Sequence, residues 1–281
     1  MDVDTYHNRA KELALQAGAI VEKAYHDRSM NVEFKGAVDL VTSVDKEVEA
    51  LLITSLRESF PECEFLAEES ADVGYTLTDK PTWVIDPVDG TTNFVHKFPF
   101  VCVSIALCVE LEVVCGVVYN PILKEMFEAR RGKGALLNGK PIKVAPCESL
   151  QQAVVATNVG YDRTEEGIQF MNENMAAILR QNVRSMRSLG SSACELCSVA
   201  CGRLDGFYEY GIHPWDIAAA ALILEEAGGQ ARDPSGDPLD LLSRRVLGGS
   251  PGVVTALASI LASDHFRHPR PSLDKKAGPP A

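Results

Sequence analysis

The chain has no hydrophobic run long enough to cross a membrane, and it does not open with a basic stretch followed by an apolar one. A transmembrane helix needs about 20 apolar residues, and a secretory leader needs that basic and apolar start. Basic residues are also few, with 27 Lys and Arg against 39 Asp and Glu, a net charge of −12. Nucleic-acid binding demands a basic face, so we expect no membrane or nucleic-acid partner and predict a cytoplasmic protein.

The chain also lacks a clear zinc site, although it contains 8 cysteines and 6 histidines. Cys194, Cys197 and Cys201 are spaced to lie on one helix face, which is compatible with metal binding, but no fourth ligand is near them. Free cysteine is among the most buried residue types, and the cytoplasm keeps thiols reduced. We therefore predict that these cysteines are buried, reduced thiols.

Two carboxylates that follow a short apolar segment are the most informative feature of the sequence. Trp83-Val84-Ile85 predicts a buried strand, and Asp86 and Asp89 follow it at a turn set by Pro87. Gly90-Thr91-Thr92 comes next, with backbone N–H groups that can bind an anion. Carboxylates repel a phosphate unless divalent cations lie between them, so the segment predicts metal-assisted phosphoryl transfer. An ordinary strand followed by an Asp-rich turn is the alternative.

Further carboxylates lie elsewhere in the chain. Glu68 and Glu69 close a short predicted strand at 63–67, although adjacent glutamates are also common in solvated loops. Asp216 precedes an alanine-rich helix predicted at 217–227 and is a candidate N-cap of that helix. With Asp86 and Asp89, these residues offer the oxygen ligands that hard cations prefer, and they do not indicate zinc.

The periodicity of the chain predicts a mixed α/β fold. An antiparallel sheet is expected in the N-terminal half, about 1–150, and regular alternation of strand and helix in the C-terminal half, about 151–264. We expect one catalytic domain over 1–264 and a disordered tail over 265–281. The predicted helices are 4–27, 42–60, 166–180, 191–202, 217–227 and 253–262. The other predicted strands are 100–110, 113–120, 125–130, 141–144 (after a hairpin turn at Asn138-Gly139), 153–157, 183–187, 206–210, 230–232 and 245–247.

The motifs around residues 86 and 216 resemble those of the inositol monophosphatase family. Asp86-Pro87-Val88-Asp89-Gly90-Thr91-Thr92-Asn93-Phe94 is similar to its first signature, and Trp215 to Ala220 with Glu226 to Gly229 is similar to its second. The similarity covers roughly residues 5 to 262, and the segments 94–100 and 211–216 resemble the animal branch, where Pro214 stands in place of a cysteine of vertebrate members. The resemblance implies a layered αβαβα sandwich, a homodimer, and Mg²⁺-dependent hydrolysis of inositol monophosphates.

The resemblance also assigns the metal ligands, for two to three Mg²⁺ ions per subunit. One ion is expected on Glu68, Asp86 and the backbone carbonyl of Val88, and a second on Asp86, Asp89 and Asp216. Inhibition by Li⁺ follows from the resemblance alone. Inhibition by Ca²⁺ is expected because its looser coordination fills a site without supporting the geometry.

Catalytic and substrate roles follow from the same resemblance. Thr91 and Asp45 are expected to activate the attacking water, and Glu68 to hold a further water-linked ion. Asp45 also lies three residues after Thr42, where it can cap a helix, and the two uses are compatible. Phosphate is expected on the backbone of Gly90, Thr91 and Thr92, beside Asp89 and Asp216, and the inositol hydroxyls on Glu209 and Ser192; Lys35, Glu69 and His213 are accessory candidates.

Three other functions have some support in the sequence. Gly248-Gly249-Ser250-Pro251-Gly252 fits the nucleophile elbow of a serine hydrolase, but Pro251 lacks the N–H that such an elbow uses for its oxyanion hole. A non-catalytic binding or scaffold protein is disfavoured because the whole set of candidate catalytic residues is present. The nearest alternative is a phosphatase of the same superfamily that acts on sugar or nucleotide bisphosphates.

Overall fold

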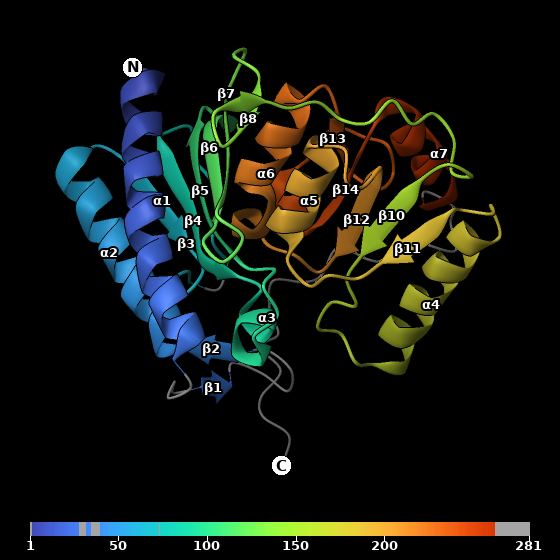
Figure 1. Cartoon of the computed structure of the whole chain (residues 1–281), viewed down its shortest axis with the longest axis horizontal. Coiled ribbons are helices and arrows are strands. Elements are labelled where there is room, and N and C mark those ends of the chain that lie inside the picture. The colour runs from blue at the N-terminus through green and yellow to red at the C-terminus, as the bar shows by residue number, and fades with distance from the viewer. Residues whose placement is uncertain (1, 28–31, 35–39, 73, 262–281) are drawn as a thin grey trace.

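Helices and sheets alternate in five layers through the molecule (Figure 1). The computed structural model describes residues 2–27, 32–34, 40–72 and 74–261. The αβαβα sandwich expected from the family resemblance is confirmed. The helical layers are α1 (Val3–His26) with α2 (Ser43–Ser59) outside the larger sheet, α5 (Ser192–Ala200) with α6 (Pro214–Glu226) between the sheets, and α4 (Glu165–Leu179) with α7 (Pro251–Leu261) outside the smaller sheet.

The larger sheet has seven strands in chain order. The pairing of its first two strands, β3 and β4, places Glu68 near Asp86 and Asp89. Every neighbouring pair is antiparallel except β3 and β4, which are parallel, so the predicted antiparallel sheet is wrong at that edge. Parallel pairing brings the carboxyl ends of β3 and β4 together, and the Glu68 N–H donates to the Ile85 carbonyl at 3.2 Å. The strands are β3 (Glu64–Ala67), β4 (Thr82–Asp89), β5 (Cys102–Val109), β6 (Glu112–Asn120), β7 (Glu125–Arg130), β8 (Ala135–Leu137) and β9 (Lys140–Pro141).

The hairpin predicted at Asn138-Gly139 joins β8 to β9. Both residues have positive φ, 49° and 74°, as a tight two-residue hairpin requires. The following strand is shorter than predicted: β9 covers Lys140–Pro141, and one further bond to β8 runs from the Ile142 N–H to the Ala135 carbonyl at 3.0 Å.

The smaller sheet has five strands, and it confirms the alternation predicted for the C-terminal half. β10 is parallel to both β11 and β12, whereas β14 is antiparallel to β12 and β13. The strand order is β11 (Ser185–Arg187), β10 (Val154–Thr157), β12 (Gly206–Tyr210), β14 (Arg245–Gly249) and β13 (Gln230–Arg232).

Helix α6 packs between the two sheets and is apolar on all sides. Ala218, Ala219 and Ala220 are fully buried in a core cluster that includes residues from both halves of the chain. The backbone of α6 lies very close to β6, since a Cβ at Gly116 would come within 2.8 Å of the Ala219 carbonyl oxygen. Small residues on both elements therefore let the second turn of α6 lie directly against the larger sheet.

The other predicted helices agree with the structure to within a few residues, but several short elements were not predicted. These are β1 (Val32–Phe34), β2 (Leu40–Thr42), α3 (Thr91–His96) and the 3₁₀ turn Leu241–Ser243. The three cysteines on α5 and its end, Cys194, Cys197 and Cys201, are free thiols. The first two are buried, as predicted, whereas Cys201 is only partly buried, so the prediction is wrong there. Lys35 and the tail over 265–281 lie outside the described residues.

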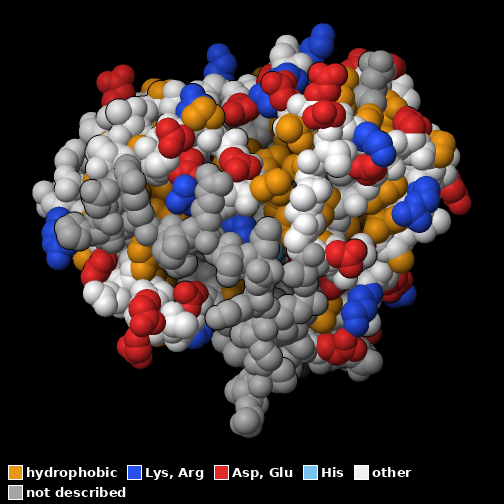
Figure 2. All heavy atoms as spheres, turned by 180° about the vertical axis from the view of Figure 1, so that it is seen from behind, with side chains coloured by type: hydrophobic (Ala, Val, Ile, Leu, Met, Phe, Trp, Pro, Cys, Tyr) orange, Lys and Arg blue, Asp and Glu red, His pale blue; other side chains and the backbone are white. Residues whose placement is uncertain are grey.

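Among the described residues, no helix combines the length and the apolar character needed to span a bilayer. On the face seen in Figure 2, the acidic and basic side chains are interspersed, with hydrophobic side chains between them. The described part of that face therefore carries no field of a single sign.

Candidate active site

A β-bulge in β4 places Asp86 and Asp89. From Asp86 to Asp89 the strand advances three residues, while its partner strand moves only two, from Ser104 to Cys102. The extra residue falls where Pro87 has no N–H for the ladder, and the Val88 N–H instead donates to Asp86 Oδ1 at 2.9 Å. The turn predicted after Ile85 is therefore wrong, because the strand continues through it. The bulge directs both carboxylates towards the same space.

Asp89 lies against the N-terminus of α5. Its Oδ2 atom accepts hydrogen bonds from the Ser191 hydroxyl at 2.6 Å, the Ala193 N–H at 2.8 Å and the Cys102 thiol at 3.7 Å. Donors and the positive end of a helix dipole favour an ionised carboxylate there. Burial outweighs them and raises the pKa of Asp89 to about 6.

Asp216 is the third residue of α6, so its prediction as the N-cap is wrong. The helix begins at Pro214, whose fixed φ suits the first helical position, and His213 is the N-cap. Asp216 Oδ2 accepts from the backbone N–H of His213 at 2.6 Å, as the acidic residue of a capping box does. The capping contact orients the carboxylate at the start of the helix.

His213 was predicted as an accessory residue beside Asp216, and it contacts Asp216 through its backbone N–H. The imidazole instead stacks on Trp215, with ring centroids 4.6 Å apart. Its Nδ1 atom lies 2.7 Å from the Tyr75 hydroxyl and its Nε2 atom 2.9 Å from the Arg244 guanidinium. The ring thus holds the start of α6 in place.

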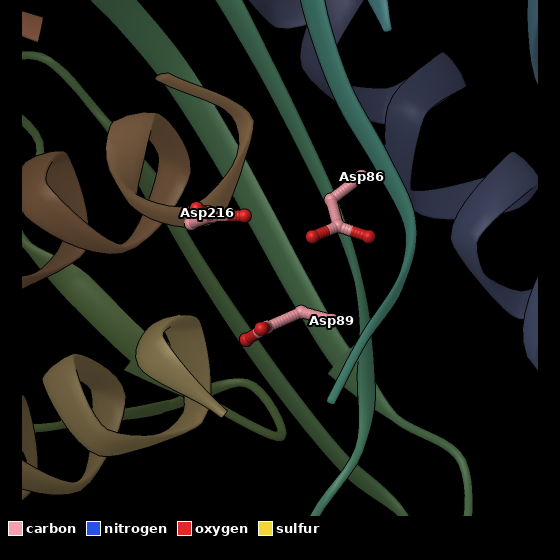
Figure 3. Close-up of side chains that lie close together, drawn as sticks. All are labelled: Asp86, Asp89 and Asp216. Carbon is pink, nitrogen blue, oxygen red and sulfur yellow. The ribbon is translucent and has the colours of Figure 1, made fainter. Parts of the chain in front are cut away.

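Asp86, Asp89 and Asp216 point towards one another from β4 and α6 (Figure 3), and one oxygen of each lies within 4.8 Å of the others. Burial, reinforced by the neighbouring carboxylates and by Glu68, raises the pKa of Asp86 and of Asp216 well above the ordinary range. No described Lys or Arg forms an ion pair with any of the three. The oxygen-only donor set and its mutual repulsion fit a hard divalent cation such as Mg²⁺.

Asp45 both caps α2 and contacts Thr91, the two uses that the sequence analysis considered. It is fully buried, and its Oδ2 atom accepts from the Thr42 N–H at 2.9 Å, which completes the capping box of α2. Its Oδ1 atom accepts from the Thr91 hydroxyl at 3.2 Å. The same hydroxyl lies 3.2 Å from the Val88 carbonyl oxygen. Capping therefore aims Asp45 at Thr91.

A cavity of about 290 Å³ lies beside these residues. Gly90 is at its edge with φ of 91°, and a Cβ there would come within 3.0 Å of the Phe100 carbonyl oxygen, so the chain needs glycine at this turn. Asp45 and Asp86 are buried and do not belong to the lining. The predicted site residues that do line it are Asp89, Gly90, Thr91, Thr92, Ser192, Glu209 and Asp216.

Asn158 and Glu195, which the sequence analysis did not single out, support the side of the cavity that contains Glu209. The Asn158 side-chain amide donates to Glu209 Oε2 at 3.1 Å and to Glu195 Oε2 at 2.6 Å, and its oxygen accepts from the Gly190 N–H at 3.0 Å. The Ser192 hydroxyl also donates to Glu209 Oε2, at 2.5 Å. Asn158 therefore links three segments of the chain.

Burial dominates the electrostatics of both glutamates. It raises the pKa of Glu195 to about 8, with the charge of Glu209 adding to the effect, and it raises the pKa of Glu209 to about 7 against the hydrogen bonds from Ser192 and Asn158. Glu195 is the only charged residue of α5, in a helix otherwise made of small and apolar residues. That isolated charge was the signal that could have identified it.

Glu69, another accessory candidate, does not line the cavity. The Glu69 N–H donates to Glu49 Oε2 on α2 at 2.7 Å, so this contact ties the end of β3 to the outer helical layer. Tyr161, which had no assigned role, lines the cavity, and so do Arg163 and Ser188.

Comparison with known proteins gives a consistent result. A model described as the inositol monophosphatase family matches residues 2–265. The chain is 50% identical over 260 residues to the inositol monophosphatase of Dictyostelium discoideum, covering 92% of this chain and 96% of that protein. It is 46% identical over 241 residues to inositol monophosphatase 1 of Homo sapiens, covering 85% and 87%. The solved structure of an inositol monophosphatase from Anabaena (Nostoc) sp. PCC 7120 is similar with a TM-score of 0.80 and 33% identity, covering 93% of this chain and 96% of that one.

Proposed function

This chain belongs to the inositol monophosphatase family and is a phosphoric monoester hydrolase, and we propose that it converts inositol monophosphates to inositol and phosphate in a Mg²⁺-dependent reaction. The observation that carries the proposal is the cluster of three aspartates, two of them buried, beside the Gly90 turn and the cavity of about 290 Å³. Phosphate monoester hydrolysis needs this combination of acidic residues, an anion-binding backbone and room for a ring.

The metal ligands are assigned as the family resemblance implies. Glu68, Asp86 and the Val88 carbonyl form one set, and Asp86 joins Asp89 and Asp216 in a second, for two to three ions per subunit. The hydrogen bonds to Oδ2 of Asp89 and of Asp216 support the second set, because each leaves its other oxygen for a cation. When bound, the ions neutralise the phosphate oxygens and lower the pKa of water.

Thr91 and Asp45 move the proton of the attacking water. The Thr91 hydroxyl accepts a hydrogen bond from the water and donates its own proton towards Asp45, 3.2 Å away. The water oxygen forms a new bond to phosphorus as the bond to the inositol oxygen breaks. That oxygen departs with the electron pair and is then protonated. The burial of Asp45 keeps this relay away from bulk solvent.

The substrate lies across the cavity, with its phosphate and ring at opposite ends. The backbone N–H groups of Gly90, Thr91 and Thr92 begin a helix and have no partners within its first turn, so they bind the phosphate. Glu209 accepts hydrogen bonds from ring hydroxyls, and Ser192 and Asn158 hold it in position. A ring with hydroxyls at fixed positions is selected by such a buried acceptor.

Four finer properties are also part of the proposal. We infer inhibition by Li⁺, and by Ca²⁺ at higher concentration, a homodimeric assembly, a cytoplasmic location, and a single catalytic unit over 1–264. The shared core between the two sheets supports the last of these.

A substrate panel tests the function. Inositol monophosphates, phosphoadenosine phosphate and fructose bisphosphate are assayed at equal concentration with Mg²⁺ and with excess chelator. We expect the highest kcat/KM for an inositol monophosphate and no turnover in chelator. Full turnover in chelator contradicts the metal requirement, and a preference for either bisphosphate contradicts the substrate assignment.

A further inference from the structure

A second cavity lies behind the segment that forms one wall of the catalytic cavity. Its volume is about 230 Å³, several times that of a water molecule, and it lies between α4, the ends of β10 and β12, and the loop after β10. Residues 158–161 line both cavities. The remaining lining residues of the second cavity belong to other parts of the fold and take no part in the proposed reaction.

Two buried polar groups at this second cavity have no partner among the described residues. The side chain of Asn174 on α4 is only 1% exposed, yet neither its nitrogen nor its oxygen forms a hydrogen bond. The Tyr210 hydroxyl on β12 is in the same situation. Both residues line the cavity. A buried polar group without a partner is costly, so its presence here indicates a ligand that completes it.

The walls of the second cavity favour a flat, apolar body. Phe170 and Tyr210 meet edge to face with ring centroids 4.9 Å apart, and Tyr208 meets Tyr210 in the same way at 6.2 Å. Met171 lines the cavity beside them. Aromatic rings arranged in this way offer faces and edges against which another planar ring packs.

The charged residues of the lining favour a neutral ligand. The Arg244 guanidinium is held by the carbonyl oxygens of Gly211 and Ile212, at 2.6 and 3.2 Å, and by His213. Asp162 accepts from the N–H and the hydroxyl of Thr164, at 2.9 and 2.8 Å. These two opposite charges are engaged by the protein, which leaves the unpaired amide and phenol as the recognition groups.

We propose that the cavity bounded by Asn174, Tyr210 and Phe170 is a second binding site, and that it takes a small, uncharged, planar ring with a hydrogen-bond donor and acceptor side by side. A cyclic amide has this chemistry: its N–H donates to the Asn174 oxygen while its carbonyl accepts from the Asn174 nitrogen. The ring then packs against Phe170 and Tyr210. The site goes beyond phosphate hydrolysis and does not depend on it.

The smallest probe that carries this pattern is 2-pyridone, and N-methyl-2-pyridone is its matched control because it lacks the donor. Binding to the full-length protein is measured by saturation-transfer NMR with Mg²⁺ and inorganic phosphate present. We expect 2-pyridone to bind at least ten times more tightly than its methylated form and to remain bound as phosphate is raised. Equal binding of the two compounds, or displacement by phosphate, overturns the proposal.

Asn174→Leu tests the recognition group, with Gln169→Leu as a control on an exposed part of the same helix. We expect Asn174→Leu to weaken 2-pyridone binding at least tenfold, to retain phosphatase activity, and to raise the melting temperature, because it removes two unpaired buried atoms. Gln169→Leu should leave binding unchanged. A lower melting temperature for Asn174→Leu would show that the amide is a structural element, and it would overturn the proposal.

Tyr210→Phe is a milder second variant that removes only the hydroxyl. We expect it to fold normally and to weaken 2-pyridone binding severalfold, since the ring wall remains. Unchanged affinity in this variant excludes the hydroxyl as a recognition group and contradicts the proposed site.

Discussion

Two groups of acidic residues lie in the lining of the catalytic cavity or directly behind it, and they are stabilised in different ways. Asp86, Asp89 and Asp216 bring one oxygen each within 4.8 Å of the others, where their charges repel. Glu195 and Glu209 are instead joined by the amide of Asn158, and both oxygens of Glu195 accept hydrogen bonds from the protein. The mutual repulsion of the first group is relieved by a bound cation, whereas the second group is completed by the chain itself.

This difference separates two tasks that use the same type of side chain. The aspartates lie at a bulge and at a helix start, where the backbone orients each through one oxygen. The glutamates lie within β12 and α5, where neighbouring side chains hold them as acceptors. We therefore assign metal binding to the aspartates and substrate recognition to Glu209, with Glu195 behind it, and variants in each group should have different effects.

The largest effect is expected for Asp216→Asn and Asp89→Asn. Mutation of a residue that only supports a metal ligand typically lowers metal affinity or activity by about 10–100-fold. Loss of a direct ligand should cost more, so we expect activity at limiting Mg²⁺ to fall more than about 100-fold. The metal-free fold should be unchanged or more stable, because one charge leaves a repulsive cluster. Initial rates over a Mg²⁺ titration and thermal melts measure both. Glu225→Gln, at a surface ion pair with Arg131, is the control. Wild-type rates at limiting Mg²⁺ would contradict the ligand assignment.

Asp45→Asn should lower kcat by about 10²–10⁴-fold while the Mg²⁺ dependence stays nearly unchanged, because its proposed partner is the Thr91 hydroxyl. Asp2→Ala is the matched control. It removes the N-cap side chain of α1, which makes no contact with Asp45 or Thr91, so it should cost about 0.5–2 kcal/mol of stability and preserve kcat. If both variants lose only stability, Asp45 is a capping residue and not part of the proton relay.

Glu209→Gln should lower kcat/KM for inositol monophosphate by about 10–100-fold, because a neutral amide replaces a charge-assisted acceptor worth roughly 1.5–3 kcal/mol. A simple aryl phosphate, which lacks the ring hydroxyls, should be affected far less. The ratio of the two kcat/KM values is the measurement. An equal loss for both substrates would place Glu209 with the catalytic aspartates and remove the contrast between the two groups.

The effect expected to be smallest on catalysis is a dependence of stability on pH. Burial raises the pKa of Glu195 from 4.5 to about 8 and that of Glu209 to about 7, so the folded state binds more protons than the unfolded state between these values. Stability should therefore be highest below pH 4.5 and fall as pH rises towards 8, with Glu195 accounting for roughly 3–5 kcal/mol. Chemical unfolding across this range in saturating Mg²⁺, which keeps the aspartates ionised, measures the slope.

Glu195→Gln is the variant that isolates this slope. It also removes one acceptor for the Leu189 N–H or the Asn158 amide, but that loss shifts the whole curve and not its dependence on pH. We expect a smaller slope between pH 7 and 8 than in the wild type. An identical slope would mean that Glu195 is ionised throughout and that its environment is more polar than its burial indicates.

The site residues that could be predicted share a local signal. Asp86, Asp89 and the Gly90 turn are recognisable because strand, carboxylates and anion-binding backbone follow one another directly in the chain. The helices were predicted to within a few residues, because their burial pattern repeats along one segment. Asn158 was missed since nothing around it distinguishes it from any other polar residue after a strand. The assignment of Lys35 stays a prediction.

The sequence by itself determined the order of most helices and strands and the types of residue at the site, because helical and strand periodicity and motif composition are properties of neighbouring residues. The layered sandwich was expected only from the resemblance to the inositol monophosphatase family. Only the tertiary structure decided that β3 runs parallel to β4, that β4 continues through a bulge to Asp89, and that α6 starts at Pro214. These features depend on contacts between segments far apart in the chain. The geometry of an acidic cluster depends on such packing, because like charges come together only where the rest of the fold holds them.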